Sequence, residues 1–199
     1  MPYAPELQNP QQSGWRYPVP VPSDVATLRR TLRLRNEQSV TIRAINPQDV
    51  DRLRRFHESL SMDTIVFRFF RVVPVLSDED AFRFTHVDYE NRMAMVATVG
   101  SGADESIVAV VRYDRTGAES AEVAFVVADK WQGLGIAPTI LCDLAAYARK
   151  RGIGRLVAIT MGSNMHMLDM LRHCGFPVSM RYVDGDVEGT LDISGASPA

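Results

Sequence analysis

The order of strand-like and helix-like segments predicts an α/β domain, in which a mixed central β-sheet carries helices on both faces. Short runs of Val, Ile, Ala and Met with strand character alternate with longer segments of helical periodicity. A glycine-containing loop at residues 132–137 joins one of these strands to a long helix. The chain has 199 residues, of which 46% are hydrophobic, and this is enough for one substantial core. We therefore expect a single domain over residues 29–199.

The first 28 residues differ in composition from the rest of the chain. They are rich in Pro, Gln and Ser, and the Pro-Val-Pro-Val-Pro run at residues 18–22 favours polyproline II conformation. We expect residues 1–28 to be an extended or disordered N-terminal arm.

Local signals predict the elements of the first half of the domain. Residues 32–35 and 40–45 alternate in polarity on either side of a polar turn, a pattern typical of a β-hairpin. Asn46 is a favourable N-cap and Pro47 suits the first turn of a helix, so a helix is expected to follow. Shorter helical segments are expected at residues 64–70 and 78–85.

The second half is predicted to contain two helices and most of the strands. The long helix covers residues 138–151, and Pro138 marks its start because proline is tolerated only in the first turn. A second helix begins at Asn164 and ends at Gly175, and the Asp-Gly pair at residues 184–185 is typical of a hairpin turn. The strands of this half are expected at residues 94–99, 107–113, 122–127, 156–160, 178–182 and 189–193.

The glycine-containing loop has the features of an anion-binding site. Gly133 and Gly135 allow successive backbone N–H groups to converge without a Cβ atom in the way. The helix that follows directs the positive end of its dipole to the same place, where a phosphate binds well. A Walker A loop would need Lys and Ser or Thr after its last Gly, where Ile136 and Ala137 stand instead. A diphosphate ligand is therefore the leading expectation for this loop.

Four stretches of the chain share their pattern with one enzyme superfamily. Gln132, Gly135 and Ala137 form Q-x-x-G-x-A, the acyl-CoA pyrophosphate loop of the GNAT superfamily of N-acyltransferases. The others are L-S-M-D-T-I-V-F-R-F-F at 60–70 with F-T-H-V-D-Y at 84–89, A-E-V-A-F-V-V-A-D at 121–129, and N-M-H-M-L-D-M-L-R-H-C-G-F at 164–176. Together they resemble bacterial protein lysine acetyltransferases of the Pat type over roughly residues 30 to 193. The resemblance implies the GNAT fold, in agreement with the α/β order of elements.

This resemblance implies acetyl-CoA as the co-substrate and no metal. In GNAT enzymes a backbone N–H receives the thioester oxygen where the fourth strand bulges and splays, which corresponds here to Val126 or Val127. Asn164 corresponds to an Asn that binds the CoA side of the cleft, although its position is also that of a simple N-cap. The residues that the resemblance assigns to CoA binding are Val126, Val127, Gln132, Gly133, Leu134, Gly135, Ile136, Ala137 and Asn164.

Glu122 is the candidate general base. Acetyl transfer to a lysine needs the neutral amine, although the ordinary lysine pKa is about 10.4. Alternation along the strand places Glu122 on the opposite face from Val123 and on the same face as Ala124. Spacing alone also fits a solvated carboxylate, or one paired with Arg112. The resemblance assigns to Glu122 the catalytic role, because the matching glutamate takes the amine proton directly or through water.

Four positions depart from the family pattern. Leu171 stands where many GNAT enzymes have a Tyr that protonates the leaving thiolate, so that proton must come from solvent or is not needed. Leu134 replaces the commoner Arg, and Pro138 removes one amide donor, so CoA affinity is expected to be reduced. Val66 stands where the Pat type usually has Tyr, which bears on recognition of the acceptor.

Composition argues against several other classes of protein. A formal net charge of -2 gives no electrostatic basis for binding nucleic acid. Cys142 and Cys174 are too few for a disulfide framework and wrongly spaced for zinc, and the four histidines show no metal-binding pattern. The chain shows no signal peptide and no long apolar run, so we expect no membrane partner and a cytoplasmic location.

The sequence is therefore interpreted as that of an acetyl-CoA-dependent N-acetyltransferase. Its acceptor is an amine, with a protein lysine side chain as the first choice and an acyl-CoA synthetase as one acceptor protein to test. A small-molecule amine acetyltransferase is the alternative among enzymes. A weakly catalytic acyl-CoA-binding regulatory module is the alternative from another class: Glu122 argues against it, whereas Leu134 and Pro138 leave it open.

Overall fold

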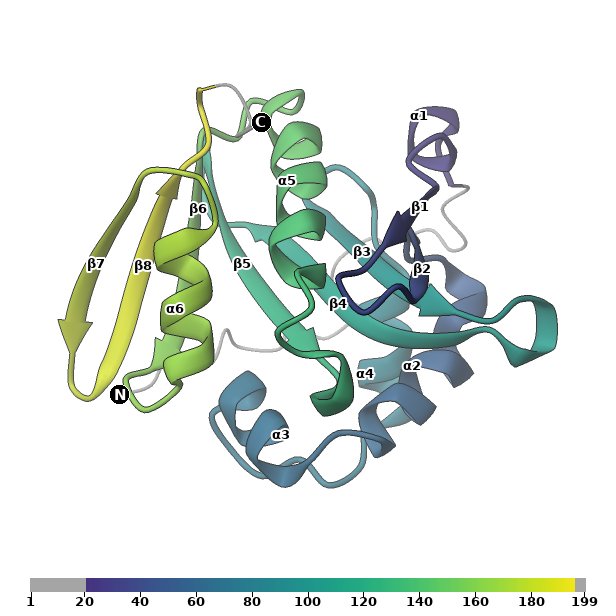
Figure 1. The fold of residues 1–199 in the computed structure, drawn as a ribbon. Helices are drawn as coiled ribbons and strands as arrows, with labels where there is room; N and C mark the ends of the chain where they lie inside the picture. Colours follow the sequence, from purple (N-terminus) through teal and green to yellow (C-terminus); the bar gives the residue numbers. More distant parts are fainter. Residues whose placement is uncertain (1–20, 196–199) are drawn as a thin grey trace.

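The computed structural model describes residues 21–195, which form an eight-stranded β-sheet with helices on both faces (Figure 1). The strand order is β1-β2-β3-β4-β5-β6-β8-β7, and all neighbours are antiparallel except β5 and β6, which are parallel. The mixed α/β sheet expected from the sequence is confirmed. The strands are β1 (Arg30–Arg33), β2 (Ser39–Ala44), β3 (Arg92–Val99), β4 (Ser106–Arg115), β5 (Ser120–Val127), β6 (Arg155–Met161), β7 (Val178–Val183) and β8 (Asp186–Asp192).

The helices fall into two groups on the two faces of the sheet. Helix α5 packs on β3, β4 and β5 and stands with α6 in front of the sheet in Figure 1, whereas α2 packs on β4 and against α4 behind it. Helix α3 lies against β5 and β6 at the lower end of the sheet in the same view. The α-helices are α1 (Ser23–Ala26), α2 (Val50–Glu58), α3 (Met62–Phe69), α4 (Asp78–Thr85), α5 (Ile136–Arg149) and α6 (Met165–His173), and short 3-10 turns lie at Pro47–Asp49, Gly102–Asp104 and Asp129–Trp131.

The predicted strands and helices are present, with differences at their ends. Asn46 is an N-cap as expected, and its side chain accepts a hydrogen bond from the Gln48 N–H at 3.0 Å. The end of the expected N-terminal arm differs, because Ser23–Ala26 is helical and Val25 is only 1% exposed. Residues 1–20 of that arm lie outside the described residues.

Helix α5 starts two residues earlier than predicted. Its N-cap is Gly135 and its first residue is Ile136, so Pro138 is the third helical residue rather than the first. The first four N–H groups of a helix have no intrahelical acceptor, so proline at this position breaks no hydrogen bond of the helix. The predicted end at Arg151 is also corrected, since the helix ends at Arg149.

The core holds α5 firmly against the sheet. Its side chains Ile140, Leu141, Leu144 and Ala145 are completely buried. Burying one Leu or Ile side chain stabilises the folded state by about 1.5 to 3 kcal/mol, so the helix is held along its length. The glycine loop at its N-terminus is therefore presented at a fixed place beside the end of β5.

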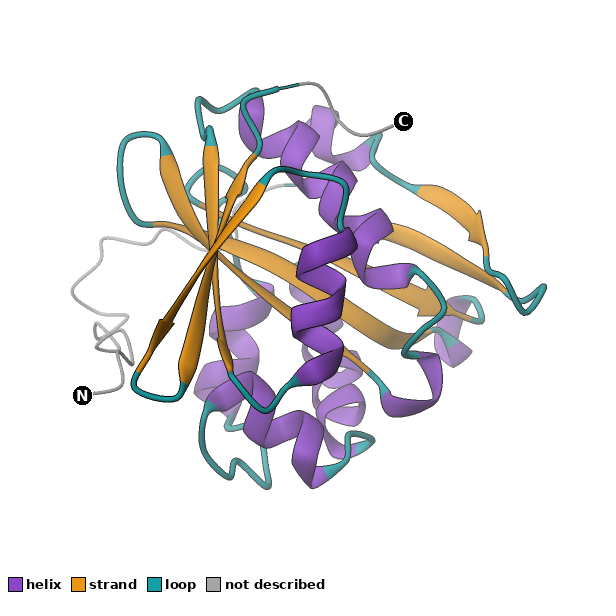
Figure 2. Ribbon diagram, turned by 60° about the vertical axis from the view of Figure 1, so that its left-hand side comes forward, coloured by secondary structure: helices purple, strands orange, loops and turns teal. Residues whose placement is uncertain are grey.

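The sheet opens between β5 and β6. These strands pair over three residues only, Ser120–Glu122 with Arg155–Val157. Beyond this short ladder, β5 continues to Val127 and β6 to Met161 without pairing to each other. Figure 2 shows how strongly the strands twist across the sheet, which is the geometry that lets two neighbours part.

Candidate active site

A large open cleft lies where β5 and β6 part. Its volume is about 2210 Å³, and its walls come from α3, the N-terminus of α5, α6 and the segment of β5 from Glu122 to Val127. Backbone groups of β5 beyond Glu122 face this gap without a partner from β6. An extended ligand can therefore run between the two strands and hydrogen-bond to β5 as an added strand would.

The glycine loop lines one end of this cleft. Gly133 and Gly135 adopt the left-handed backbone region, with φ of 72° and 83°, and a Cβ at either would meet no protein atom within 4 Å. Glycine is thus required here by the backbone conformation, and the space around it is left open. Ile136 and Ala137 open the helix, so their N–H groups have no intrahelical acceptor. This is the geometry of a diphosphate site at a helix N-terminus.

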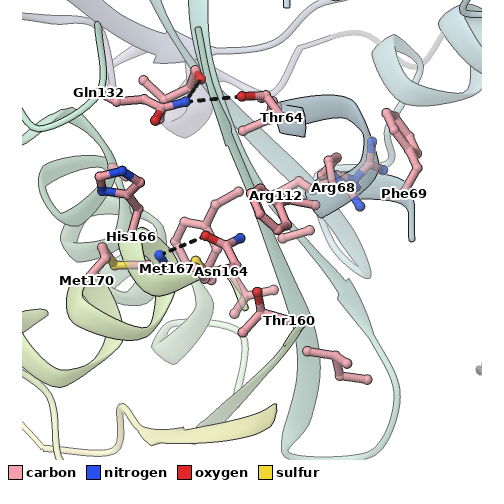
Figure 3. Close-up of a pocket in the computed structure, with 18 of the residues that line it drawn as sticks. Thr64, Arg68, Phe69, Arg112, Gln132, Thr160, Asn164, His166, Met167 and Met170 are labelled. Carbon is pink, nitrogen blue, oxygen red and sulfur yellow. Dashed lines mark hydrogen bonds between the residues drawn. The ribbon is translucent and has the colours of Figure 1, made fainter. Parts of the chain in front are cut away.

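Gln132 braces the loop rather than leaving its amide nitrogen for a ligand. Its Nε2 donates to the Val127 carbonyl oxygen at 3.0 Å and to Thr64 Oγ1 at 3.3 Å. Figure 3 shows the bond to Thr64, which crosses from the loop to α3. The side chain predicted to bind CoA therefore fixes the shape of the loop that would bind it.

A second contact, which we call the Asp129 clamp, joins α3 to the residues just before the loop. Asp129 accepts hydrogen bonds from the Ser61 N–H at 2.9 Å, from Ser61 Oγ at 2.5 Å and from Thr64 Oγ1 at 2.9 Å. Partial burial alone would raise the pKa of Asp129, but these hydrogen bonds outweigh it and hold the pKa below its ordinary value. Since Ser61 is the N-cap of α3, the start of that helix is tied to the loop.

Val126 and Val127 lie on the part of β5 that pairs with β4 but not with β6, and this part contains no bulge. The register between β4 and β5 runs without a shift from Ala109↔Val127 to Arg115↔Ala121, so the predicted bulge is absent. The Ala128 N–H donates to Val108 on β4 at 2.9 Å, and alternation along the strand then directs the Val127 N–H to the gap. The candidate donor for a thioester oxygen is therefore Val127 rather than Val126.

The opposite wall of the cleft is formed by α6 and the end of β6. Asn164 is the N-cap of α6, since its Oδ1 accepts from the Met167 N–H at 3.1 Å (Figure 3). Leu171 is completely buried in the core and supplies no acid to the cleft. Thr160 is 2% exposed and lines the cleft, and within the described residues its hydroxyl has no hydrogen-bond partner.

Glu122 stands at the last paired position of β5, where the gap begins. It lies opposite Asp114 on β4 and opposite Val157 on β6, and it is half-buried in the wall of the cleft. Burial raises the pKa of Glu122, and the nearby charge of Arg68 opposes this effect without cancelling it. Among residues 21–195 no hydrogen bond or ion pair engages its carboxylate, so the alternative of a carboxylate paired with Arg112 is not realised. An unpaired carboxylate with a raised pKa is suited to accept a proton.

Arg112 is instead paired with Asp114. Its Nε lies 3.1 Å from one carboxylate oxygen of Asp114, and Arg92 Nε lies 2.8 Å from the other. Burial alone would raise the pKa of Asp114, but the two guanidinium groups hold it at about 2. The two carboxylates that face each other across β4 and β5 therefore differ in character: Asp114 is an ion-pair partner and Glu122 is free.

The cleft brings the predicted site together with one exception. Leu134 does not line it, because its side chain packs partly buried against the core. Val66 is also absent from the cleft wall, whereas Arg68 of the same helix is part of it. The predicted residues that do line the cleft are Glu122, Val126, Val127, Gln132, Gly133, Gly135, Ile136, Ala137 and Asn164.

Three residues of the site were not singled out from the sequence. Arg68 lies inside the stretch at 60–70 that resembles Pat-type enzymes, so that pattern contained it without a role. Asp129 was visible only as the polar end of a strand, because its partner Ser61 is 68 residues away in the chain. Thr160 ends a predicted strand, and no spacing indicates that its hydroxyl faces a cleft.

Two further searches of the described residues concern metals and membranes. Between residues 21 and 195, no group of three or more His, Cys, Asp or Glu side chains is arranged to hold a metal ion. Within the same range, no helix is both long enough and apolar enough to cross a membrane.

Comparison with known proteins identifies the family. Residues 39–177 match the family described as acetyltransferase (GNAT) domain. The chain is 30% identical over 138 residues to acetyltransferase PA5475 of Pseudomonas aeruginosa, covering 69% of this chain and 74% of that one. It is also 30% identical over 146 residues to acetyltransferase Pat of Mycolicibacterium smegmatis, covering 72% of this chain but only 43% of that longer protein.

A solved structure agrees with these relatives. The GNAT domain of S. lividans PAT superposes with a TM-score of 0.77 at 35% identity, covering 89% of this chain and 99% of that domain. The resemblance to GNAT enzymes of the Pat type and the predicted fold are thereby confirmed. The chain belongs to the GNAT acetyltransferase family and is an acetyl-CoA-dependent N-acetyltransferase.

Proposed function

We propose that this acetyltransferase transfers the acetyl group of acetyl-CoA to the side-chain amine of a protein lysine, with Glu122 as the general base. The observation that carries the proposal is the state of Glu122, a half-buried carboxylate in the cleft with a raised pKa and no ion pair among the described residues. A structural carboxylate would be paired and would have a lowered pKa, as Asp114 has. Glu122 therefore has the properties of a base rather than of a structural partner.

The base is needed because lysine is protonated at neutral pH. With an ordinary pKa of about 10.4, only about 1 in 2,500 lysine side chains is neutral at pH 7. Glu122 takes a proton from the ammonium group through bridging water, since it lies five residues along β5 from Val127, and the nitrogen then forms a bond to the acetyl carbon. The nitrogen loses its second proton to water as the amide forms, the C–S bond of the thioester breaks, and CoA leaves as its thiolate. A raised pKa brings Glu122 closer to the working pH, which improves it as a base.

The other end of the cleft fits the co-substrate. Acetyl-CoA supplies the activated acyl group, and the backbone N–H groups of Gly135, Ile136 and Ala137 would hold its pyrophosphate. The Val127 N–H faces the gap, where it would stabilise the negative charge on the thioester oxygen. Leu171 offers no proton, so the thiolate takes its proton from solvent.

A protein acceptor is supported by the likeness to acetyltransferase Pat of M. smegmatis and to the S. lividans PAT domain. The charges around Glu122 add a second reason. Arg68 and Arg112 both line the cleft beside it. Their positive charges disfavour the binding of polyamines, which carry several positive charges themselves. We propose acyl-CoA synthetases as the first acceptor proteins to examine.

The test is acetyl-CoA turnover against a panel of proteins, including acyl-CoA synthetases, and against free amines, including spermidine. Release of CoA gives the rate, and mass spectrometry of the products locates the acetyl groups. We expect particular lysines of a protein to be acetylated by the wild-type enzyme and far more slowly by Glu122→Gln. Free amines reacting much faster than every protein would contradict a protein acceptor while leaving the acetyltransferase reaction itself intact.

A further inference from the structure

The two edges of the β-sheet differ in how well they are protected. Within the described residues the strand order begins with β1 and ends with β7, which lies at the outer left of the sheet in Figure 1. Strand β1 has four residues, two of which are Arg30 and Arg33, and short charged strands are a common protection of a sheet edge. Strand β7 has six residues, of which Arg181 is the one charged residue. The β7 edge therefore lacks the protection that β1 has.

Half of the backbone groups of β7 face away from the sheet. The Asp192 N–H donates to the Pro177 carbonyl oxygen at 2.9 Å, and this pair continues the register of β7 and β8. In an antiparallel ladder, residues that are hydrogen-bonded to the neighbouring strand alternate with residues that are not. The N–H and C=O groups that point outward therefore belong to Val178, Met180 and Tyr182.

These outward-facing groups accompany exposed apolar side chains. Tyr182 and Val183, at the end of β7, expose 65% and 42% of their surface. Between residues 21 and 195, no strand pairs with the outer side of β7. A row of unpaired N–H and C=O groups with apolar side chains is a template for the addition of another strand.

The β7 edge is complementary to itself in one register. If a two-fold axis passes beside Met180, this residue lies opposite its own copy, and Val178 lies opposite Tyr182 of the partner subunit. All three outward-facing residues of each copy then pair, and because each pair exchanges two hydrogen bonds, six backbone hydrogen bonds form. An aromatic residue opposite a β-branched residue is also a favourable cross-strand pair.

Charge and strand length favour this register over the adjacent ones. An axis at Arg181 would place two guanidinium groups opposite each other, which is unfavourable. An axis at Ser179 would leave Tyr182 beyond the end of the partner strand. With the axis at Met180, Arg181 lies opposite the neutral Ser179 of the partner subunit. Arg181 can also keep its ion pair with Glu188 on β8, in which the N–O distance is 3.1 Å.

We propose that β7 pairs antiparallel with β7 of a second copy of this chain, in the register centred on Met180, so that two sheets join into one. The inference is independent of the proposed acceptor. The β7–β8 hairpin is smaller than the 20 to 30 residues that each partner contributes to a standard interface, so we expect a weak dimer with a dissociation constant of roughly 1 to 100 µM. This dimer is an interaction surface beyond the catalytic cleft.

Sedimentation velocity of the full chain tests the proposal. Over roughly 1 to 200 µM the measured mass should rise from that of one copy toward that of two, as expected for such a constant. A chain that remains monomeric over this range would overturn the inference.

Substitutions at the exposed Ser179 test the register, because this residue is expected to face Arg181 of the partner subunit twice in each dimer. Ser179→Glu should tighten the dimer by roughly 2- to 30-fold, and Ser179→Lys should weaken it by a similar factor. The matched controls are Thr31→Glu and Thr31→Lys, which change the charge of the exposed β1 edge and should leave the dissociation constant unchanged. Equal effects of the two Ser179 variants, or no effect of either, would overturn the proposed pairing.

Tyr182→Pro tests the backbone of the edge. Proline removes an N–H that points outward, so the ladder between β7 and β8 keeps its hydrogen bonds while the ladder between two copies loses two of its six. Tyr182→Thr keeps the N–H and is the control for loss of the ring. We expect the proline variant to dissociate more readily than the threonine variant, and equal dissociation of the two would contradict pairing through the backbone.

An extended segment of an acceptor protein is the other occupant that this edge could bind. In that case the wild type would remain monomeric, and Ser179→Lys would change the acetylation rate of a protein acceptor without changing that of a free amine. This result would overturn the pairing of two copies. Failure of the proposed lysine acetylation is a separate outcome, because sedimentation reports the dimer whether or not any acceptor is acetylated.

Discussion

Replacing Glu122 by Gln removes the proton acceptor and keeps the size of the side chain. We expect kcat/KM for a lysine acceptor to fall by roughly 10²- to 10⁴-fold at pH 7, which is the usual contribution of a general base. This corresponds to about 3 to 5 kcal/mol of transition-state stabilisation. Affinity for acetyl-CoA should change little, because Glu122 is about 17 Å along β5 from Val127 and the glycine loop.

The pH dependence follows from the direction of the pKa shift. Burial raises the pKa of Glu122 above 4.5, so the wild-type rate should increase as pH rises through that raised value and the carboxylate ionises. The variant should lack this limb and depend instead on the amine, whose neutral fraction grows tenfold per pH unit below about 10.4. Between pH 7 and 9 its deficit should therefore shrink by up to about 100-fold. Stopped-flow or steady-state measurement of CoA release checks this, and a deficit that stays constant over that range would refute the assignment of Glu122.

Thermal unfolding of the same variant provides an independent control. Because the folded-state pKa is raised, ionised Glu122 costs stability at pH 7, whereas below the unfolded value of about 4.5 both states are protonated and the cost is absent. Glu122→Gln should thus have a higher melting temperature than the wild type at pH 7, and the difference should disappear in acid. A variant that melts lower at pH 7 would indicate a structural role for the carboxylate.

Two further substitutions and one labelling experiment test other parts of the site. Gly135→Asp forces a side chain into φ of 83° and puts a negative charge at the phosphate end, so acetyl-CoA should no longer raise the melting temperature, and unchanged stabilisation would contradict the loop assignment. Thr160→Val replaces a buried hydroxyl without a partner among the described residues and should stabilise the free enzyme by up to about 1 kcal/mol, as measured by denaturant unfolding; a loss of stability would mean that the hydroxyl is already satisfied. When the enzyme is incubated with acetyl-CoA, the exposed Lys130 beside the loop should be acetylated before the exposed Lys150 at the far end of α5, and equal labelling in Glu122→Gln would reveal uncatalysed chemistry.

Local chemistry explains why much of the fold was predictable. The Asn46 N-cap, the glycine turn before α5 and the strand alternation around Glu122 each depend on residues close together in the chain. The start of α5 was misjudged because proline is acceptable at several positions of a first turn, and only the unpaired N–H groups decide among them. The bulge expected near Val126 came from the family resemblance. In this structure β5 parts from β6, while its register with β4 continues without a shift.

The site was predictable where one segment carries the chemistry and unpredictable where two segments meet. The loop and Glu122 each lie within a single recognisable stretch. Glu122 has no ion pair because Arg112 pairs with Asp114, two residues away on β4. Glu122 itself lies on the neighbouring strand β5, and the sequence does not indicate which of the two carboxylates Arg112 binds. The contacts between Asp129 and the start of α3, and the position of Arg68 on α3 beside the cleft, likewise arise only when α3 packs against β5 and β6 in the folded chain.

The Asp129 clamp has a consequence for the order in which substrates bind. Helix α3 is lightly anchored, since Ile65 is its one buried side chain, and its start is held by the residues that lead into the glycine loop. A ligand that shifts this loop would therefore also shift the start of α3, because these hydrogen bonds join the two segments. We therefore expect acetyl-CoA to influence the wall that the acceptor meets, and steady-state kinetics to be sequential and ordered, with acetyl-CoA binding first and free CoA released last.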